Sequence, residues 1–283
     1  MPYWYYNGYA FITLQKGREQ MDIGASTACL YPLETEKALY ELAIRDIKNM
    51  EIFINSVDEL DGEIYADIRK TIADYNISVK SFHPFSSPME SLFLFSDYQR
   101  RTDYLIDMYK RYFERLSELG AKFFILHGAI ISSNVPDDRY LERYLKLYRT
   151  AQEFGVTVLQ ENISYCKSCE LDFLKKMSRE LGDEVRFVLD TKQARRSKVD
   201  VYDFLDAVGD KVAHIHISDC DEKGDCLPIG KGKFCFEKLF AKLGELKFDG
   251  SMIVELYREN YTSYDDLKDS VTALQKKLDD YRQ

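Results

Sequence analysis

Short apolar runs rich in β-branched residues alternate with longer segments of helical periodicity along most of the chain. Short apolar runs of this kind are typical of parallel strands that are buried on both faces. The clearest is Val156 to Asn162, Val-Thr-Val-Leu-Gln-Glu-Asn, which follows Gly155 and ends in polar side chains. We predict strands at residues 21–26, 51–54, 78–83, 122–127, 156–162, 186–190, 212–217 and 251–255.

The segments between these runs carry apolar residues at helical spacing. Before Gly120, which stands where a residue following a helix belongs, the pattern is formed by Leu105, Met108, Tyr112, Leu116 and Leu119. Residues 84–96 contain Pro, Ser and Phe without a clear period, and we expect a long loop there. Further helices are predicted around residues 39–47, 59–75, 141–148, 171–177, 201–208, 236–243 and 267–278.

Eight strands alternating with helices predict an α/β fold, a single closed (β/α)8 TIM barrel. An open doubly wound sheet is the alternative, but it usually has a Gly-rich phosphate loop after its first strand. The segment Ile23-Gly-Ala-Ser-Thr27 lacks such a loop. Residues 1–20 are aromatic and weakly patterned, so we interpret them as an N-terminal extension and residues 21–283 as one barrel domain.

The composition narrows the class of protein. The 283 residues are 45% apolar, and 39 basic against 48 acidic residues give a net charge of −9, which disfavours a nucleic-acid partner. The N-terminus lacks the features of a signal peptide, and no apolar run approaches the length of a membrane span. Cys166 and Cys169 form a lone CxxC pair that we interpret as incidental thiols. We expect a cytoplasmic protein.

Polar residues end four of the predicted strands: Glu161, Asp190, His216 and Glu255. Active sites of (β/α)8 barrels lie at the C-terminal ends of the strands. Three carboxylates in a low-dielectric mouth repel one another, and a divalent cation removes that cost. We therefore predict one metal ion bound by these four side chains, against the alternative of four unrelated polar residues. Oxygen-rich ligation favours Mn²⁺ or Mg²⁺, while histidine also suits Zn²⁺ or Co²⁺.

The 4 histidines of the chain, His83, His127, His214 and His216, all lie near predicted strand ends. His214 and His216 are two residues apart, so they face the same side of their strand. His216 is nearer the mouth and is the predicted ligand. His214 is interpreted as a histidine of the inner barrel.

Several short segments together resemble the xylose isomerase-like barrel superfamily of sugar isomerases, epimerases and abasic-site nucleases. They are Gln160-Glu161-Asn162, Leu189-Asp190-Thr191, His214-Ile-His216-Ile-Ser-Asp219, Pro228-Ile-Gly-Lys-Gly232 and Ile253-Val254-Glu255. The resemblance covers nearly the whole chain from Met21. It implies that Glu161, Asp190, His216 and Glu255 bind one divalent metal. It also implies that His83 and His127 either face substrate or, with Glu161, hold a second metal ion.

The chain departs from the family pattern after the sixth predicted strand. Family members usually have a histidine where this chain has Gln193, and the nucleases place further ligands where it has Gly224 and Cys226. These changes count against a third metal and therefore against the nuclease activity.

We accordingly interpret the chain as a metal-dependent sugar or sugar-phosphate isomerase or epimerase of carbohydrate metabolism. Glu161 and Glu255 would be the catalytic residues, transferring a proton next to a substrate carbonyl through an ene-diolate. Two alternatives stay open: an endonuclease IV-like phosphodiesterase and a sugar-binding barrel without turnover. We expect a small-molecule substrate, no membrane partner, and leave a homo-oligomer open. The predicted substrate-binding residues are His83, His127, Gln193, Lys192 and Arg258.

Overall fold

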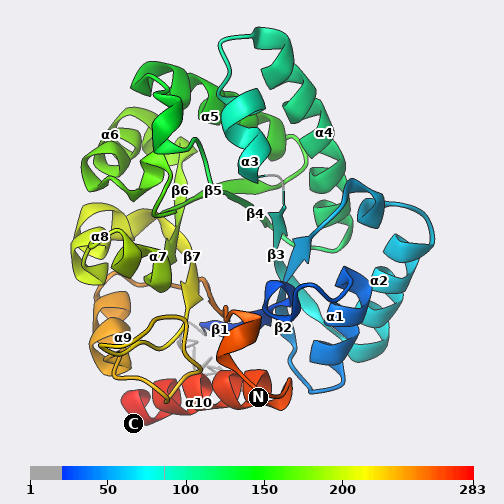
Figure 1. Ribbon diagram of the computed structural model, residues 1–283, viewed down its shortest axis with the longest axis vertical. Coiled ribbons are helices and arrows are strands. Elements are labelled where there is room, and N and C mark those ends of the chain that lie inside the picture. Colours follow the sequence, from blue (N-terminus) through cyan, green and yellow to red (C-terminus); the bar gives the residue numbers. More distant parts are fainter. Residues whose placement is uncertain (1–20, 86) are drawn as a thin grey trace, which may run out of the picture.

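A computed structural model describes residues 21–85 and 87–283 and shows a closed barrel of eight parallel strands in sequence order, ringed by helices (Figure 1). The fold is therefore the predicted (β/α)8 barrel. The strands are β1 (Asp22–Ser26), β2 (Asn49–Ile54), β3 (Ser78–Pro84), β4 (Phe123–Leu126), β5 (Thr157–Glu161), β6 (Arg186–Asp190), β7 (Val212–Ile217) and β8 (Ser251–Val254). The expectation that residues 1–20 form an extension lies outside the described residues.

The longer helices follow the strands in the expected alternation and cover the outside of the barrel (Figure 1). Among the described residues, no helix has both the length and the apolar character needed to cross a membrane. The helices are α1 (Thr35–Ala43), α2 (Gly62–Tyr75), α4 (Gln99–Glu118), α5 (Asp137–Gln152), α6 (Leu171–Leu181), α7 (Thr191–Arg196), α8 (Val201–Val208), α9 (Phe236–Glu245) and α10 (Asp265–Arg282).

The predicted long loop at residues 84–96 is wrong in part. The segment contains a short helix, α3 (Ser87–Met89), followed by a π-helical turn, η3 (Glu90–Leu94). The 3.6-residue period is absent because the segment is short and its turn is closed by a bond between residues five apart, from the amide of Phe95 to the carbonyl oxygen of Glu90. The turn buries Leu94, and the carboxyl group of Glu90 is also buried.

Successive side chains of each strand point alternately to the two faces of the barrel sheet. Those on the outer face pack against the helices, whereas those on the inner face point into the barrel. Inside the barrel, Ile125, Leu159 and Val188 form a small apolar cluster that is separate from the main core. The residues two positions further along these strands are His127, Glu161 and Asp190. The polar mouth therefore stands directly above an apolar plug.

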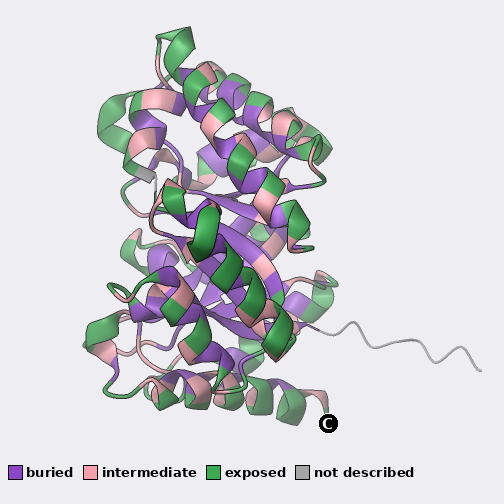
Figure 2. Cartoon of the chain, turned by 90° about the vertical axis from the view of Figure 1, so that its right-hand side faces the viewer, coloured by how far each residue is buried: buried purple, intermediate pink, exposed green. Residues whose placement is uncertain are grey.

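The outer face of β4 packs against an aromatic layer from α4. The ring of Phe124 is fully buried and makes edge contacts with Tyr109, Tyr112 and Phe113 at centroid distances of 4.9, 6.0 and 5.1 Å. Figure 2 shows the same division across the molecule, with buried strands inside and exposed outer faces of the helices. This layer fixes α4 against the strand that leads to His127.

Replacing Phe124 with Ala should lower the free energy of unfolding by about 3–5 kcal/mol, because it opens a cavity among three rings. Denaturant titration followed by circular dichroism measures the change. The exposed Leu92, at 63% exposure, provides the control, and Leu92→Ala should change stability by no more than about 0.5 kcal/mol. Equal losses in both variants would contradict the packing argument.

Candidate active site

Four predicted ligands meet at the carboxyl ends of four neighbouring strands. Glu161 ends β5, Asp190 ends β6, His216 is the penultimate residue of β7, and Glu255 directly follows β8. Each is at most 8% exposed. All four side chains come together around the imidazole ring of His216.

The Nδ1 atom of His216 faces three carboxylates. It lies 2.9 Å from Oε1 of Glu161, 4.0 Å from Oδ2 of Asp190 and 3.9 Å from Oε2 of Glu255. One nitrogen and three carboxylate oxygens thus surround a common region. This donor set has the chemistry that binds Mn²⁺, Mg²⁺ or Zn²⁺ in proteins.

The other ring nitrogen of His216 contacts a residue that the sequence analysis missed. Glu51 of β2 is fully buried, and its Oε2 lies 3.1 Å from Nε2 of His216 and 3.3 Å from Nε2 of His214. Ser81 donates a hydrogen bond of 2.7 Å to the same oxygen. A proton on Nε2 of His216, donated to Glu51, leaves the Nδ1 lone pair directed at the three carboxylates. His214 contributes to this lower network, in agreement with the inner-barrel interpretation.

A second donor set shares Glu161. The Nε2 atoms of His83 and His127 lie 2.6 Å apart, and they lie 3.8 and 3.1 Å from Oε2 of Glu161. The grouping of His83, His127 and Glu161 has the spacing of a metal site, as do the groupings Glu161–Asp190–His216 and Glu51–His83–His216. Glu161 therefore links the grouping that contains His83 and His127 to the grouping that contains Asp190 and His216.

Oε2 of Glu161 and Oδ2 of Asp190 accept no hydrogen bond at the centre of this cluster, and their charges are met by ion-pair contacts with His127 at 3.1 Å and Lys192 at 3.3 Å. A buried anionic oxygen that accepts no hydrogen bond is costly. Both oxygens point to the region where the donor sets converge. The residues present therefore fit a divalent cation.

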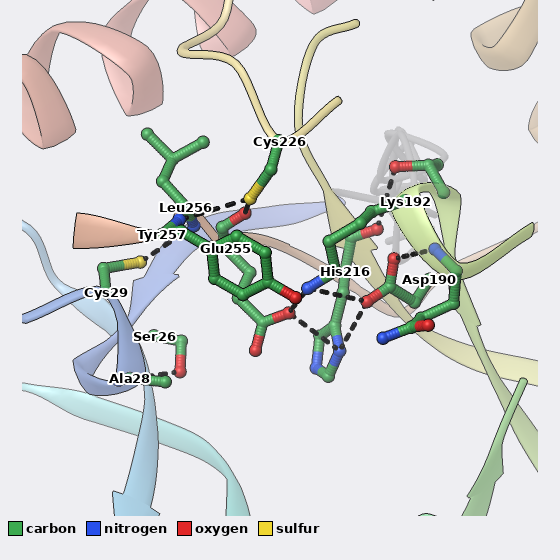
Figure 3. Close-up of polar contacts among 12 residues, drawn as sticks. Ser26, Ala28, Cys29, Asp190, Lys192, His216, Cys226, Glu255, Leu256 and Tyr257 are labelled. Carbon is green, nitrogen blue, oxygen red and sulfur yellow. Dashed lines mark hydrogen bonds and ion pairs between the residues drawn. The ribbon is translucent and has the colours of Figure 1, made fainter. Parts of the chain in front are cut away.

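Lys192 lies inside this cluster. It follows Asp190 by two residues, at the start of α7, and is only 5% exposed. Its Nζ lies 2.7 Å from Oε2 of Glu255 and 3.3 Å from Oδ2 of Asp190, as Figure 3 shows. Lys192 is a predicted substrate-binding residue, and in the structure it also pairs with two of the predicted ligands.

The charges in the cluster shift one another's protonation. Burial alone would raise the pKa of Glu161, but His216 and His127 hold it well below its usual range. Burial would likewise lower the pKa of His216, but Glu51, Glu255 and Glu161 hold it well above its usual value. Burial raises the pKa of Asp190 to about 6, although Lys192 opposes the shift. A protonated His216 imidazole partly neutralises the negative charge of the carboxylates, and a bound metal ion would take the place of its proton.

The cluster opens into a cavity of about 710 Å³ at the barrel mouth. Glu161 and Glu255 line it, whereas Asp190 and His216 do not and lie beneath its floor. Aromatic side chains form much of the remaining wall, together with Arg196. The aromatic residues are Tyr31, Phe53, Phe85, Tyr165 and Tyr257.

The predicted substrate-binding residues are divided by the structure. His83, His127, Lys192 and Gln193 line the cavity. Arg258 does not: it is exposed, donates to the carbonyl oxygen of Tyr261 at 3.0 Å and stacks on that residue's ring. Its role in substrate binding stays a prediction that this position does not favour. Arg196, on α7, is the arginine that reaches the cavity.

The positions that differ from the nuclease pattern have other partners. The Oε1 atom of Gln193 accepts a hydrogen bond of 3.2 Å from the backbone of Ser164. The thiol of Cys226 contacts the carbonyl oxygen of Glu255 and the amide of Tyr257. In the described part of the chain, Cys226 takes part in no grouping with metal-site spacing. Cys226 instead holds the backbone on either side of Leu256.

A closed parallel barrel with carboxylates and histidines at its mouth defines the broad class of this protein. The chain belongs to the xylose isomerase-like TIM barrel family, whose model matches residues 42–278. No curated protein matches the chain.

Solved structures share this fold at low sequence identity. A D-tagatose 3-epimerase-like protein has a TM-score of 0.74 at 16% identity, covering 93% of this chain and 100% of its own. A D-allulose 3-epimerase from Methylomonas sp. in complex with D-allulose has a TM-score of 0.73 at 15% identity, covering 91% and 96%. A 3-keto-D-glucoside 4-epimerase from E. coli has a TM-score of 0.71 at 15% identity, covering 91% and 100%.

Glu90 supports the exit of β4 from beneath. Its fully buried carboxyl group accepts hydrogen bonds from the amide of Gly128, which follows His127, and from the hydroxyl of Tyr109. Gly128 has φ of +94°, and a Cβ there would overlap the hydroxyl of Tyr140. Burial raises the pKa of Glu90 to about 7, although His127 and the Gly128 amide oppose the shift.

Stability should therefore depend on pH through Glu90. A native pKa above the unfolded value means that the native state binds more protons, so this contribution to stability falls as pH rises between the two values. Relative to Glu90→Gln, the wild type should lose roughly 2 kcal/mol of unfolding free energy between about pH 5 and about pH 8. Urea titrations of both proteins across this range measure the difference. A difference that stays constant with pH would contradict the raised pKa.

Proposed function

We propose that the protein is a divalent-metal-dependent isomerase or epimerase of sugars or sugar phosphates. The observation that carries this is the placement of Glu161 and Glu255 at the floor of the cavity, both within 4 Å of Nδ1 of His216. Two carboxylates on one cavity floor can remove and return a proton at the same substrate carbon. The epimerase names of the structural neighbours support the substrate class.

Glu161, Asp190, His216 and Glu255 would hold the metal, and the oxygens of Glu161 and Asp190 that accept no hydrogen bond favour a cation there. When bound, it would act as a Lewis acid that stabilises negative charge on the substrate oxygens. Mn²⁺ or Mg²⁺ fits the oxygen-rich set best. A second ion at His83 and His127 would share Glu161.

The proton transfer falls to the two glutamates. One carboxylate takes the proton from the carbon next to the substrate carbonyl, and the C–H electron pair moves into the ene-diolate. The other glutamate would return to carbon a proton that it takes up from solvent. Return to the opposite face inverts the centre, and return to the neighbouring carbon moves the carbonyl. Asp190 and His216 lie beneath the floor and would take no part in this transfer.

The remaining cavity residues would orient the substrate. His83 and His127 line the cavity wall together with Glu161. Lys192 and Gln193, both on α7, line it as well. Imidazole and amide groups both donate and accept hydrogen bonds, which suits sugar hydroxyl groups. Arg196 pairs with Asp225 at 2.7 and 2.9 Å, and its guanidinium would be the group in the cavity wall that meets a substrate phosphate.

Two other functions remain as alternatives. An abasic-site phosphodiesterase is disfavoured because Gln193 and Cys226 have other partners, and none of the three groupings with metal-site spacing among the described residues includes Cys226. Only an activity assay distinguishes a sugar-binding barrel without turnover from the enzyme. A panel of ketoses, aldoses and their phosphates, assayed with Mn²⁺, distinguishes the three.

In D₂O, turnover should place solvent deuterium on the substrate carbon next to the carbonyl, because a glutamate that accepts a proton exchanges it with solvent. Glu161→Gln and Glu255→Gln should each lower the rate by about 100- to 10,000-fold at saturating metal. Proton NMR of the product measures both deuterium content and rate.

Full activity of both metal-saturated variants would overturn the assigned roles. Turnover without deuterium would exclude solvent-exchanging glutamates and favour hydride transfer. Binding of a sugar with no turnover by the wild type would instead promote the binding-barrel alternative.

Glu51→Gln should weaken divalent-metal binding by about 10–100-fold, because an amide holds the Nε2 proton of His216 less firmly than a carboxylate does. Isothermal titration calorimetry with Mn²⁺ measures the affinity. The control is Glu59→Gln, a buried glutamate that contacts Thr35 and Asn55 and no histidine. Equal affinities in the two variants would show that Glu51 does not orient His216.

A further inference from the structure

The ammonium group of Lys192 shares its oxygens with the proposed metal position. Oε2 of Glu255 and Oδ2 of Asp190, which Lys192 contacts at 2.7 and 3.3 Å, are the same atoms that face Nδ1 of His216 at 3.9 and 4.0 Å. In Figure 3, Lys192 reaches between the two carboxylates from above. A metal ion held by this set would have Lys192 as its immediate neighbour.

Lys192 also has a distinct electrostatic position. Within residues 21–85 and 87–283, no other lysine or arginine forms an ion pair with Asp190 or Glu255. Lys192 is 5% exposed, so solvent screens its charge only weakly. Its positive charge therefore acts at close range on whatever cation approaches the two carboxylates.

A divalent metal ion and the ammonium group of Lys192 would repel each other if both contacted the same carboxylates. A divalent ion at the carboxylates and an ammonium group in contact with the same oxygens repel each other strongly in a medium of low dielectric constant. The ammonium group has a second partner in Tyr257, since Nζ lies 4.8 Å from the centre of that ring, which the guanidinium of Arg196 also approaches at 5.1 Å. That ring lines the cavity, and a cation over an aromatic face is favourable.

We propose that Lys192 is an internal counter-ion of the carboxylates and competes with the divalent metal for Asp190 and Glu255. In the metal-free protein it holds both side chains in place for binding. When the metal binds, the ammonium leaves Glu255 and stays in the cavity wall beside Tyr257. Metal affinity is thus set by a competition within the chain. This inference rests on the proposed function for the identity of the ligands.

Lys192→Met tests the competition, since methionine keeps much of the side-chain length and removes the charge. The whole protein is stripped of metal with a chelator, and Mn²⁺ binding is measured by calorimetry. The variant should bind Mn²⁺ about tenfold more tightly or better, while its metal-free form should melt at a lower temperature than the wild type. Lys192→Arg keeps the charge and should bind Mn²⁺ with nearly wild-type affinity.

Lys233→Met is the matched control, because Lys233 pairs only with Glu222 on the exposed loop before α9 and should leave Mn²⁺ affinity unchanged. Should Lys192→Met fail to fold without metal, Lys192→Gln, which can donate hydrogen bonds to both carboxylates, replaces it. Unchanged or weaker Mn²⁺ binding by the uncharged variants would overturn the competition.

The calorimetry also separates this inference from the proposed function. If neither the wild type nor Lys192→Met binds Mn²⁺, both ideas fail. If Lys192→Met gains affinity but the wild type turns over no sugar, the counter-ion role stands and the isomerase proposal falls. If the wild type turns over sugar with Mn²⁺ and the affinities are equal, only the counter-ion role is overturned.

Discussion

A carboxylate buried in a barrel mouth is tolerable only when a cation or a hydrogen-bond donor meets it, and this constraint organises the whole site. Glu51, Glu161, Asp190 and Glu255 are all at most 8% exposed. His216 meets Glu161 with one nitrogen and Glu51 with the other, while Lys192 meets Glu255. The need for neutralisation thus explains why histidines and a lysine stand among these carboxylates.

The architecture of the barrel brings these charges together and keeps them dry. Alternation along the strands raises the charged side chains one layer above the apolar cluster of Ile125, Leu159 and Val188. Only Glu161 and Glu255 of the four predicted ligands also line the cavity above. The four predicted ligands therefore fall into two pairs: Glu161 and Glu255 face the cavity, and Asp190 and His216 lie below them.

The sequence predicts the barrel and much of the mouth, because strand-end residues follow directly from strand limits. The bounds of β6 and β7 agree with the prediction to the residue. Glu51 was missed because it lies early in an apolar run, two residues before Phe53, where only the closed barrel brings it to His216. The pairing of Lys192 was missed for a similar reason: it follows β6, and helix α7 turns its side chain back over Glu255. Local patterns do not encode such encounters between distant strands.

The order of the donors along the chain has a consequence for biosynthesis. Glu51, His83 and His127 come from β2 to β4 or directly after them, whereas Asp190, His216 and Glu255 come from the end of β6 onward. Glu255 reaches its place only when β8 pairs with both β7 and β1 and closes the ring. A growing polypeptide therefore holds histidines long before it holds the full carboxylate set. The last strand to leave the ribosome completes the donor set, so a metal ion bound by the growing chain would meet a different set of ligands from the one that the closed barrel offers.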